Sequence, residues 1–307
     1  MKYVLFATAL VTGVGCNLIL DQHPGVTCTC APEHGTGKCV DGACVITACD
    51  FAFEDVDHDS SNGCETQSPL AVDSLALWLR ADQGVTVANG SVVGWENQAP
   101  PGGVTSVTMG APTLDDTGAW PDVDLPSVRF RGSDLMGVDL SAMMSAPGYT
   151  TFVAVARYGD GPYNCVLGSP TYPPATGWSC GGTPNAAGTA FQLGWTSNTR
   201  AFSEPFCSAT SITTTANDAT SFQPVVMTAW FDPGAPAHYF SLDGTTVSTQ
   251  VYAHALVGLS SPSMLGGCPS GPRLDGLVGE VIVYSTLLSN DDRDLVHAYL
   301  KARWKTH

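Results

Sequence analysis

The cysteines divide this chain into regions with different requirements for folding. Of its eleven cysteines, six lie between Cys28 and Cys64, four lie between Cys165 and Cys268, and Cys16 stands apart. Each group is even in number, as complete disulfide pairing within each region requires. The region around the first six has few large apolar side chains, so it depends on disulfides to fold. The cysteines expected to form disulfides are Cys28, Cys30, Cys39, Cys44, Cys49, Cys64, Cys165, Cys180, Cys207 and Cys268.

The first fifteen residues have the pattern of an export signal. Lys2 supplies a positive charge, and the apolar run at residues 4–14 is shorter than the roughly 20 residues that span a bilayer. The run ends in Gly13-Val14-Gly15-Cys16, which resembles the bacterial lipobox and implies a lipid on Cys16, the only membrane attachment expected. The lipobox usually has leucine where Gly13 stands, so an ordinary signal peptide is the alternative. Export and the cysteine content both indicate an extracytoplasmic, oxidising compartment.

The chain is strongly acidic. It has 12 lysines and arginines against 28 aspartates and glutamates, a formal net charge of −16, which becomes −17 when Lys2 leaves with the signal. Such a surface repels nucleic acid and anionic lipid headgroups. With 44% hydrophobic and only 13% charged residues, the composition is that of a folded chain. We therefore expect a folded protein with no nucleic-acid partner.

Beyond the signal at residues 1–15 and a cysteine-rich module at residues 16–68, residues 69–307 are predicted to form one all-β domain. Short β-branched and aromatic runs recur between turn signals, and Asn89-Gly90 and Asp243-Gly244 are typical hairpin turns. Consecutive apolar positions, as at residues 152–156, indicate central strands of a two-layer sandwich whose second side is partly covered by loops. Strands are predicted at residues 75–80, 85–87, 91–95, 127–131, 150–157, 190–195, 225–231, 238–242, 245–248 and 277–284.

One helix is predicted after the last strand. Ser289 is its expected N-cap with Asp292 in the capping-box position, and an apolar face continues to Trp304. Trp78, Trp95 and Trp230 lie within predicted strands and are expected in the core.

Several motifs of the β domain together resemble a known family. They are Leu75-Ala76-Leu77-Trp78-Leu79-Arg80-Ala81-Asp82 with Gly84-Val85-Thr86-Val87, then Val93-Gly94-Trp95-Glu96-Asn97-Gln98, and Pro126-Ser127-Val128-Arg129-Phe130-Arg131-Gly132-Ser133-Asp134. With the last strand and the helix, they resemble the laminin-G-like, concanavalin A-like lectin/glucanase domains of secreted bacterial proteins. The resemblance implies a jelly-roll β-sandwich that binds carbohydrate or protein as commonly as it hydrolyses glycan, so the fold does not settle the function.

A second resemblance covers part of the cysteine-rich module. The segment from Ala48-Cys49-Asp50 to Asn62-Gly63-Cys64-Glu65-Thr66 looks like short cysteine-containing repeats found ahead of such domains in bacterial surface lipoproteins.

The same segment contains a candidate calcium loop. Asp55, Asp57 and Asp59 alternate and are followed by Asn62 and Glu65, which offers the oxygen ligands that Ca²⁺ collects. The pattern resembles thrombospondin-type and EF-hand-like calcium loops. It departs from them in having Ser60 at the position of the usual glycine, and in a glutamate one place early. The alternative is a solvated acidic turn.

The sandwich region lacks the catalytic motif of its enzymatic relatives. Glycosidases need two carboxylates that flank the scissile bond, and jelly-roll glucanases of the retaining type carry them as Glu-x-Asp-x-Glu on one strand, a motif absent here. Glu280 is the lone acid of an apolar strand and is expected to be an edge or loop-paired carboxylate. We therefore expect no enzyme activity, with a glycoside hydrolase as the alternative.

Sugar binding needs a flat aromatic face rimmed by hydrogen-bonding groups. Tyr163, Asn164, Tyr172 and Trp178 supply this in a loop region that a Cys165–Cys180 disulfide would hold, which would leave Cys207 to pair with Cys268. Four cysteines allow three pairings, and these aromatics could instead pack under their own loop. The sequence thus favours a surface lipoprotein that binds a polysaccharide or another surface protein. The alternatives are a hydrolase and a spacer domain.

Overall fold

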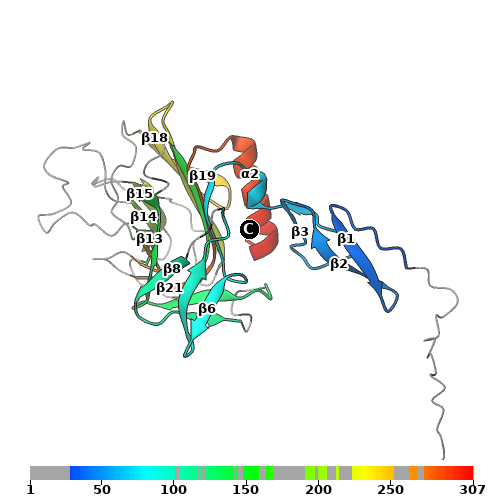
Figure 1. The fold of residues 1–307 in the computed structure, drawn as a ribbon. Coiled ribbons are helices and arrows are strands. Elements are labelled where there is room, and N and C mark those ends of the chain that lie inside the picture. The colour runs from blue at the N-terminus through cyan, green and yellow to red at the C-terminus, as the bar shows by residue number, and fades with distance from the viewer. Residues whose placement is uncertain are drawn as a thin grey trace, which may run out of the picture.

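Two antiparallel sheets form a sandwich, and one helix covers the outer face of one sheet (Figure 1). The computed structural model describes residues 28–100, 102, 104–116, 118, 120, 122–141, 143, 148–158, 164–168, 191–197, 200–205, 212–213, 223–251, 263–267 and 273–306. No helix within these residues is both long enough and apolar enough to cross a membrane.

The first sheet, which we call the helix-side sheet, has eight strands in the order β19-β18-β17-β12-β21-β10-β9, with β5 also paired to β21. The long strand β21 reaches two partners because its first half pairs with β10 and its second half with β5. The strands are β5 (Leu75–Arg80), β9 (Thr113–Asp115), β10 (Ser127–Arg131), β12 (Tyr149–Arg157), β17 (Val225–Asp232), β18 (Ala237–Leu242), β19 (Thr245–Val251) and β21 (Asp275–Tyr284).

The second sheet has nine strands in the order β16-β15-β14-β13-β20-β11-β8-β7-β6. Asn89 and Gly90 both have positive φ in the tight turn between β6 and β7, as a type I′ hairpin requires. The strands are β6 (Val85–Ala88), β7 (Ser91–Glu96), β8 (Val104–Met109), β11 (Leu135–Val138), β13 (Asn164–Gly168), β14 (Phe191–Ser197), β15 (Arg200–Pro205), β16 (Ile212–Thr213) and β20 (Ser263–Leu265).

The helix-side sheet is buried on both faces in its middle. Strand β12 is buried at all nine positions, and its side chains alternate between two apolar clusters. Val153 and Val155 point into the core between the sheets, while Phe152 and Ala154 point to the opposite face. The predicted central strand is confirmed. The cover on its second side is helix α2 (Asn290–Trp304), whereas the sequence led us to expect loops.

Helix α2 begins as the sequence predicts. The Oγ atom of Ser289 accepts a hydrogen bond from the backbone N–H of Asp292, which stabilises the first turn. The helix buries Val296, Tyr299, Leu300 and Trp304 against the outer face of the sheet. Burial of one apolar stripe is what holds a helix of this length in place.

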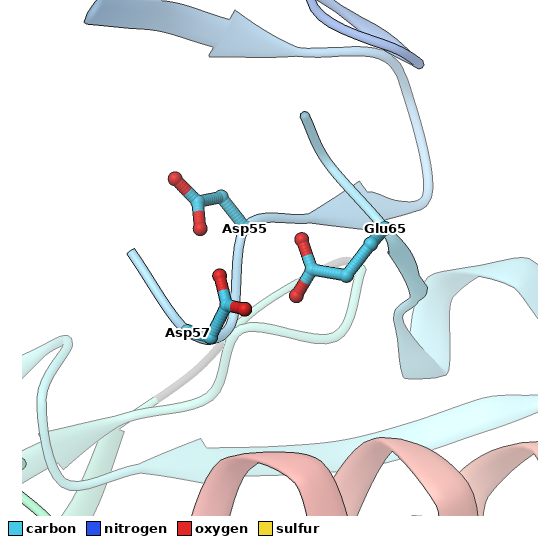
Figure 2. Close-up of side chains that lie close together, drawn as sticks. All are labelled: Asp55, Asp57 and Glu65. Carbon is cyan, nitrogen blue, oxygen red and sulfur yellow. The ribbon is translucent and has the colours of Figure 1, made fainter. Parts of the chain in front are cut away.

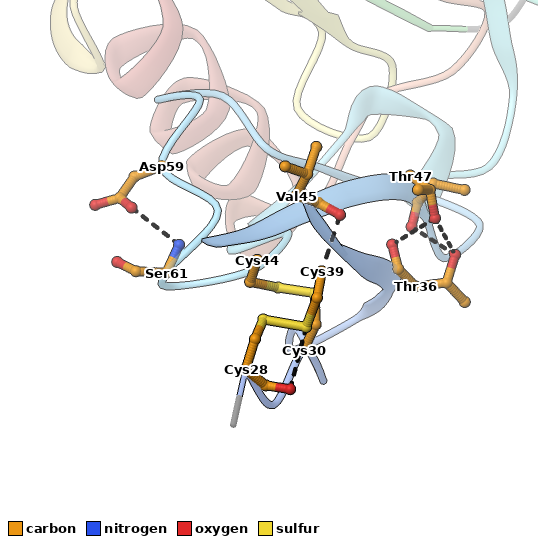
Figure 3. The surroundings of a disulfide bond; sticks show 10 residues. Cys28, Cys30, Thr36, Cys39, Cys44, Val45, Thr47, Asp59 and Ser61 are labelled. Carbon is orange, nitrogen blue, oxygen red and sulfur yellow. Dashed lines mark hydrogen bonds between the residues drawn. A yellow bond between two sulfur atoms is a disulfide. The ribbon is translucent and has the colours of Figure 1, made fainter. Parts of the chain in front are cut away.

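Two small hairpins build the described part of the cysteine-rich module, and three disulfides brace them. Strand β1 (Gly35–Val40) pairs with β2 (Ala43–Cys49), and β3 (Phe53–Glu54) pairs with β4 (Thr66–Gln67). A short 3₁₀ helix, η1 (Pro69–Ala71), then leads into the sandwich. The disulfides are Cys28–Cys39 and Cys30–Cys44, which Figure 3 shows, and Cys49–Cys64.

These disulfides answer the pairing question that the sequence left open. The bridge from Cys49 to Cys64 ties the β1–β2 hairpin to the acidic loop, and Cys64 is fully buried. On β1 and β2 the hydroxyls of Thr36 and Thr47 lie 3.2 Å apart, a cross-strand hydrogen bond on an exposed surface. Three disulfides in one small module place the chain in an oxidising, extracytoplasmic compartment.

A buried cluster of charges joins the cysteine-rich module to the sandwich. Glu54 on β3 contacts Arg80 of β5 at 2.6 Å and Arg303 of α2 at 3.4 Å. Asp82 contacts the same two guanidinium groups. Glu280 on β21 contacts Arg303 at 3.3 Å and has no exposed side-chain surface. Because the β3–β4 hairpin and α2 share these contacts, the module lies against the C-terminal half of the helix.

Candidate functional site

Three of the five predicted calcium ligands come together in the structure. One carboxylate oxygen from each of Asp55, Asp57 and Glu65 lies within 4.8 Å of the others (Figure 2). Asp55 and Asp57 follow strand β3, and Glu65 precedes strand β4, so pairing of the two short strands brings the three side chains to one end of the hairpin.

The other two predicted ligands are engaged within the loop. The Oδ1 atom of Asp59 accepts a hydrogen bond from the Ser61 N–H at 2.9 Å, and these bonds with Ser61 lower the pKa of Asp59 (Figure 3). The Nδ2 group of Asn62 donates to Asp57 Oδ2 at 3.0 Å, so it orients a carboxylate of the triad. The structure therefore groups Asp55, Asp57 and Glu65 and leaves Asp59 apart from them.

The triad has the electrostatics of a cation site. Burial raises the pKa of Asp55, and the neighbouring Glu65 carboxylate raises it further. The Asp55 Oδ1 atom is buried and has no hydrogen-bond partner within the described residues. Ca²⁺ binds six to eight oxygen ligands, and carboxylate oxygens are its usual protein ligands. The donor set therefore fits Ca²⁺, which would relieve the repulsion between Asp55 and Glu65.

The predicted loop aromatics Tyr163, Tyr172 and Trp178 lie outside the described residues, as do Cys16, Cys180, Cys207 and Cys268. Asn164 is described and is 2% exposed at the start of β13. Its Oδ1 atom accepts a hydrogen bond from the Asp275 N–H at 3.3 Å, so the amide links the two sheets. Cys165 is disulfide-bonded. The site prediction for these loops stays a prediction.

Glu280 is not the edge or loop-paired carboxylate that the sequence led us to expect. It lies on the central strand β21 and accepts hydrogen bonds from the indole N–H groups of Trp78 and Trp304, the latter at 2.9 Å. The guanidinium of Arg303 completes its surroundings. A carboxylate that is sealed from solvent by two indoles and an arginine serves packing between sheet and helix, and it cannot reach a substrate.

The outer face of the helix-side sheet carries a cavity beside the first turn of α2. We call it the outer cavity. It has a volume of about 490 Å³ and is lined by Trp230, Asp232, Tyr239, Leu287, Leu288, Ser289, Asn290 and Arg293. Trp230 on β17 stacks on its cross-strand neighbour Tyr239 on β18, with ring centroids 5.1 Å apart and planes within 3°. The Arg293 guanidinium lies 4.6 Å from the centroid of the Trp230 ring.

Trp230 is buried, at 6% exposed, as the sequence predicts, but it does not belong to either apolar cluster of the sandwich. Trp95 belongs to the core between the sheets and Trp78 to the cluster under α2, as expected, but Trp230 belongs to neither cluster. It faces outward because Ala229 and Phe231, on either side of it, face the inter-sheet core. Alternation along residues 228–231 is the signal in the sequence that could have placed Trp230 on the outer face.

Two of the three comparisons with known proteins found no match. No family model matches the chain, and no curated protein matches it. Solved structures do match. One is described as the crystal structure of HCR/D-Sa-GBL1/C, with 12% identity and a TM-score of 0.51 over 74% of this chain and 52% of that one. This chain therefore spans about half of that structure.

Two further structures are similar at lower scores. Domain 4 of AbnA, an extracellular arabinanase of Geobacillus stearothermophilus in complex with arabinotriose, has 15% identity and a TM-score of 0.48 over 73% of this chain and 98% of that one. A Trypanosoma rangeli sialidase in complex with sialic acid has 14% identity and a TM-score of 0.49 over 76% and 34%. The match with a TM-score of 0.51, at 12% identity, shows the fold alone, and this fold is the antiparallel β-sandwich with a C-terminal helix that the sequence predicts.

Proposed function

We propose that this protein is a non-enzymatic, extracytoplasmic binding protein that recognises glycan through its sandwich. The observation that carries the proposal is the outer cavity, where the stacked rings of Trp230 and Tyr239 adjoin Asp232, Asn290 and Arg293. Sugars bind where an aromatic face meets a few placed polar groups.

The hydrolase alternative needs two carboxylates that are free to act on a glycosidic bond. Asp232 lines the outer cavity, but its Oδ1 atom accepts hydrogen bonds from the N–H groups of Gly234 and Ala235 at 2.8 and 3.2 Å. It therefore caps the turn that follows β17. The cavity supports binding better than hydrolysis, and another surface protein is the remaining alternative ligand.

Three parts of the sequence interpretation enter the proposal. The first is a lipid on Cys16 that tethers the protein to a membrane, which mass spectrometry of the N-terminal peptide would detect in wild type and not in Cys16→Ala. The second is a further glycan contact through Tyr163, Tyr172 and Trp178. The third is Ca²⁺ bound by the carboxylate triad at residues 55, 57 and 65, with Asp59 and Asn62 supporting the loop.

The test is retention of the protein, from residue 17 onward, on a panel of immobilised polysaccharides, with and without a calcium chelator. We expect saturable retention without soluble fragments. Tyr239→Ala should weaken retention, whereas Phe51→Ala should not, because Phe51 is 82% exposed on the cysteine-rich module, away from the cavity. Released fragments would establish the hydrolase. The absence of retention on every polysaccharide would overturn glycan binding.

The same panel separates the two candidate contact regions. If Tyr239→Ala binds as wild type does, the outer cavity is not the site, and Trp178→Ala then tests the loop. Loss of retention under the chelator would connect binding to Ca²⁺.

A further inference from the structure

A second cavity continues the outer cavity along the sheet and helix. We call it the inner cavity. It has a volume of about 250 Å³ and is lined by Trp230, Ser241, Gly244, Asn290, Arg293, Asp294 and His297. Trp230, Asn290 and Arg293 line both cavities, so the two are adjoining compartments on either side of these residues. A ligand that extends from the stacked rings would enter the inner cavity next.

Two buried polar atoms of the inner cavity have no hydrogen-bond partner. Ser241 is 1% exposed and His297 is 6% exposed. Within the part of the chain that the structure describes, neither the Ser241 Oγ atom nor the His297 Nδ1 atom makes a hydrogen bond. Buried polar groups are hydrogen-bonded in the great majority of cases, so two unpaired atoms on residues that line one cavity leave two hydrogen bonds for a ligand or for water to make.

The position of the His297 ring is fixed from three sides. Its Nε2 atom lies 3.2 Å from the Thr228 Oγ1 atom, and Thr228 is the cross-strand neighbour of Ser241. Phe152 packs edge-on against the ring at 5.2 Å. Gly244 has a positive φ of 81°, and a Cβ atom there would lie 3.5 Å from the ring. The hydrogen bond with Thr228 occupies Nε2, so Nδ1 is the ring nitrogen that has no hydrogen-bond partner among the described residues.

The hydrogen-bonding character of these two atoms selects the ligand. Burial, with Lys301 and Arg293 nearby, lowers the pKa of His297 to about 4, so the imidazole is neutral at pH 7. If Nε2 carries the proton then Nδ1 accepts, and if Thr228 donates to Nε2 then Nδ1 donates. The Ser241 hydroxyl can do either. Ligand hydroxyl groups satisfy both atoms in either tautomer, because a hydroxyl donates and accepts.

The charges around the inner cavity do not favour an anion. Among the described residues that line it, Arg293 is the only cationic side chain, and it already donates to the Leu288 carbonyl oxygen and to Asn290 Oδ1, while Lys301 lies near His297 without lining the cavity. Asp232 and Asp294 also act on Arg293 electrostatically. A carboxylated or sulfated sugar would meet these carboxylates and a guanidinium that is already engaged.

We propose that the inner cavity is a subsite for one neutral sugar residue, whose hydroxyls bond to Ser241 Oγ and His297 Nδ1 while the adjoining residue of the saccharide lies in the outer cavity. The inference rests on the proposed glycan binding and names its ligand class and a specificity-determining pair. Ser241 lies on strand β18 and His297 on helix α2, so the sheet and the helix fix the distance between their two polar atoms. The pair therefore selects sugars in which two hydroxyl groups have a matching separation.

The test is titration calorimetry with neutral trisaccharides of glucose, mannose, xylose and arabinose and with trigalacturonate. We expect at least one neutral trisaccharide to bind and Ser241→Ala to weaken it about threefold to tenfold, the effect of one hydrogen bond. Ser241→Ala should not lower the unfolding temperature of the free protein, because the lost hydroxyl has no partner there. Ser127→Ala is the matched control: Ser127 is fully buried on β10, also with an unpartnered Oγ, and should leave affinity unchanged.

The results of this titration distinguish failure of the proposed subsite from failure of the proposed glycan binding. If a neutral trisaccharide binds and Tyr239→Ala weakens it, but Ser241→Ala does not, glycan binding stands and the subsite is wrong. Tighter binding of trigalacturonate than of every neutral trisaccharide would overturn the neutral class. If none of the five saccharides binds, both the subsite and the proposed function fail for these ligands.

Discussion

Replacing Arg303 with methionine should destabilise the protein strongly. Its guanidinium lies among three carboxylates, those of Glu54, Asp82 and Glu280, and Arg80 is the second cation of the cluster. The side chain of Arg303 is 2% exposed, and that of Glu280 is fully buried. Without Arg303, the three carboxylates share only the guanidinium of Arg80. Glu280 then loses the guanidinium that lies nearest to it.

The magnitude follows from the burial of this cluster. Removing one partner of a buried ion pair costs about 3–5 kcal/mol, because the remaining charge is left uncompensated. For a domain of this size that loss lowers the unfolding temperature by about 10 °C. Methionine retains most of the aliphatic length, so little of the expected effect comes from a cavity. The assay is urea unfolding of Arg303→Met and wild type at the same pH and salt.

The control is Arg129→Met. Arg129 pairs with Asp275 at 2.5 Å, but Asp275 is 44% exposed; because Arg129 also donates to the Gly276 carbonyl oxygen, the loss should be about 1–2 kcal/mol, below that of Arg303→Met. Glu280→Gln in the Arg303→Met background should recover part of the stability, because it removes the uncompensated carboxylate. A loss under 1 kcal/mol for Arg303→Met, or no coupling with Glu280→Gln, would refute the argument that this cluster is an integral part of the structure.

Three other perturbations follow from local features. The double variant Cys49→Ser/Cys64→Ser removes a disulfide with a sequence separation of 15, so the free energy of unfolding of the module should fall by about 3 kcal/mol. Proteolysis of this segment should therefore be faster than in wild type, and equal proteolysis rates in the two proteins would contradict the prediction. Ca²⁺ should raise the unfolding temperature of wild type and not of Asp55→Asn, and equal shifts in both would exclude the triad. Between pH 7 and pH 5 the free energy of unfolding of wild type should fall by about 2 kcal/mol more than that of His297→Gln. Burial lowers the pKa of His297 in the folded protein from 6.5 to about 4, so the unfolded chain binds the proton over this pH range while the folded protein does not. Urea unfolding at both pH values measures this, and parallel losses would count against it.

Most of the sandwich could be predicted from local pattern. All ten strands predicted from β-branched runs and turn signals are present, with ends within three residues, and the capped helix runs to Trp304 as expected. Two of the strands that were not predicted, β11 and β20, have weak local signals. Strand β11 contains Gly137 within four residues, and β20 is three residues long. Such strands exist because neighbouring strands supply their pairing, which no local window contains.

The pairing of the six cysteines and the packing of helix α2 on the helix-side sheet could not be predicted from the sequence. Both depend on which segments meet, and sequence spacing does not determine this for six cysteines. The buried cluster is the same kind of feature: Glu54 and Arg303 are 249 residues apart. In the acidic loop, alternation correctly grouped Asp55, Asp57 and Glu65, but it could not show that Asp59 would bond to Ser61 instead.

The inner and outer cavities exist because helix α2 is narrower than the sheet it covers. The helix buries Phe152 and Ile282 on the central strands, while the outward side chains of β17 and β18 lie beside its first turn. This part of the outer face carries Trp230, which is 6% exposed with Tyr239 stacked on it, and Tyr239 itself, whose side chain stays partly exposed. Arg293 covers part of Trp230. A ligand that stacks on Tyr239 would complete the burial of this face, which is the physical reason to expect binding there.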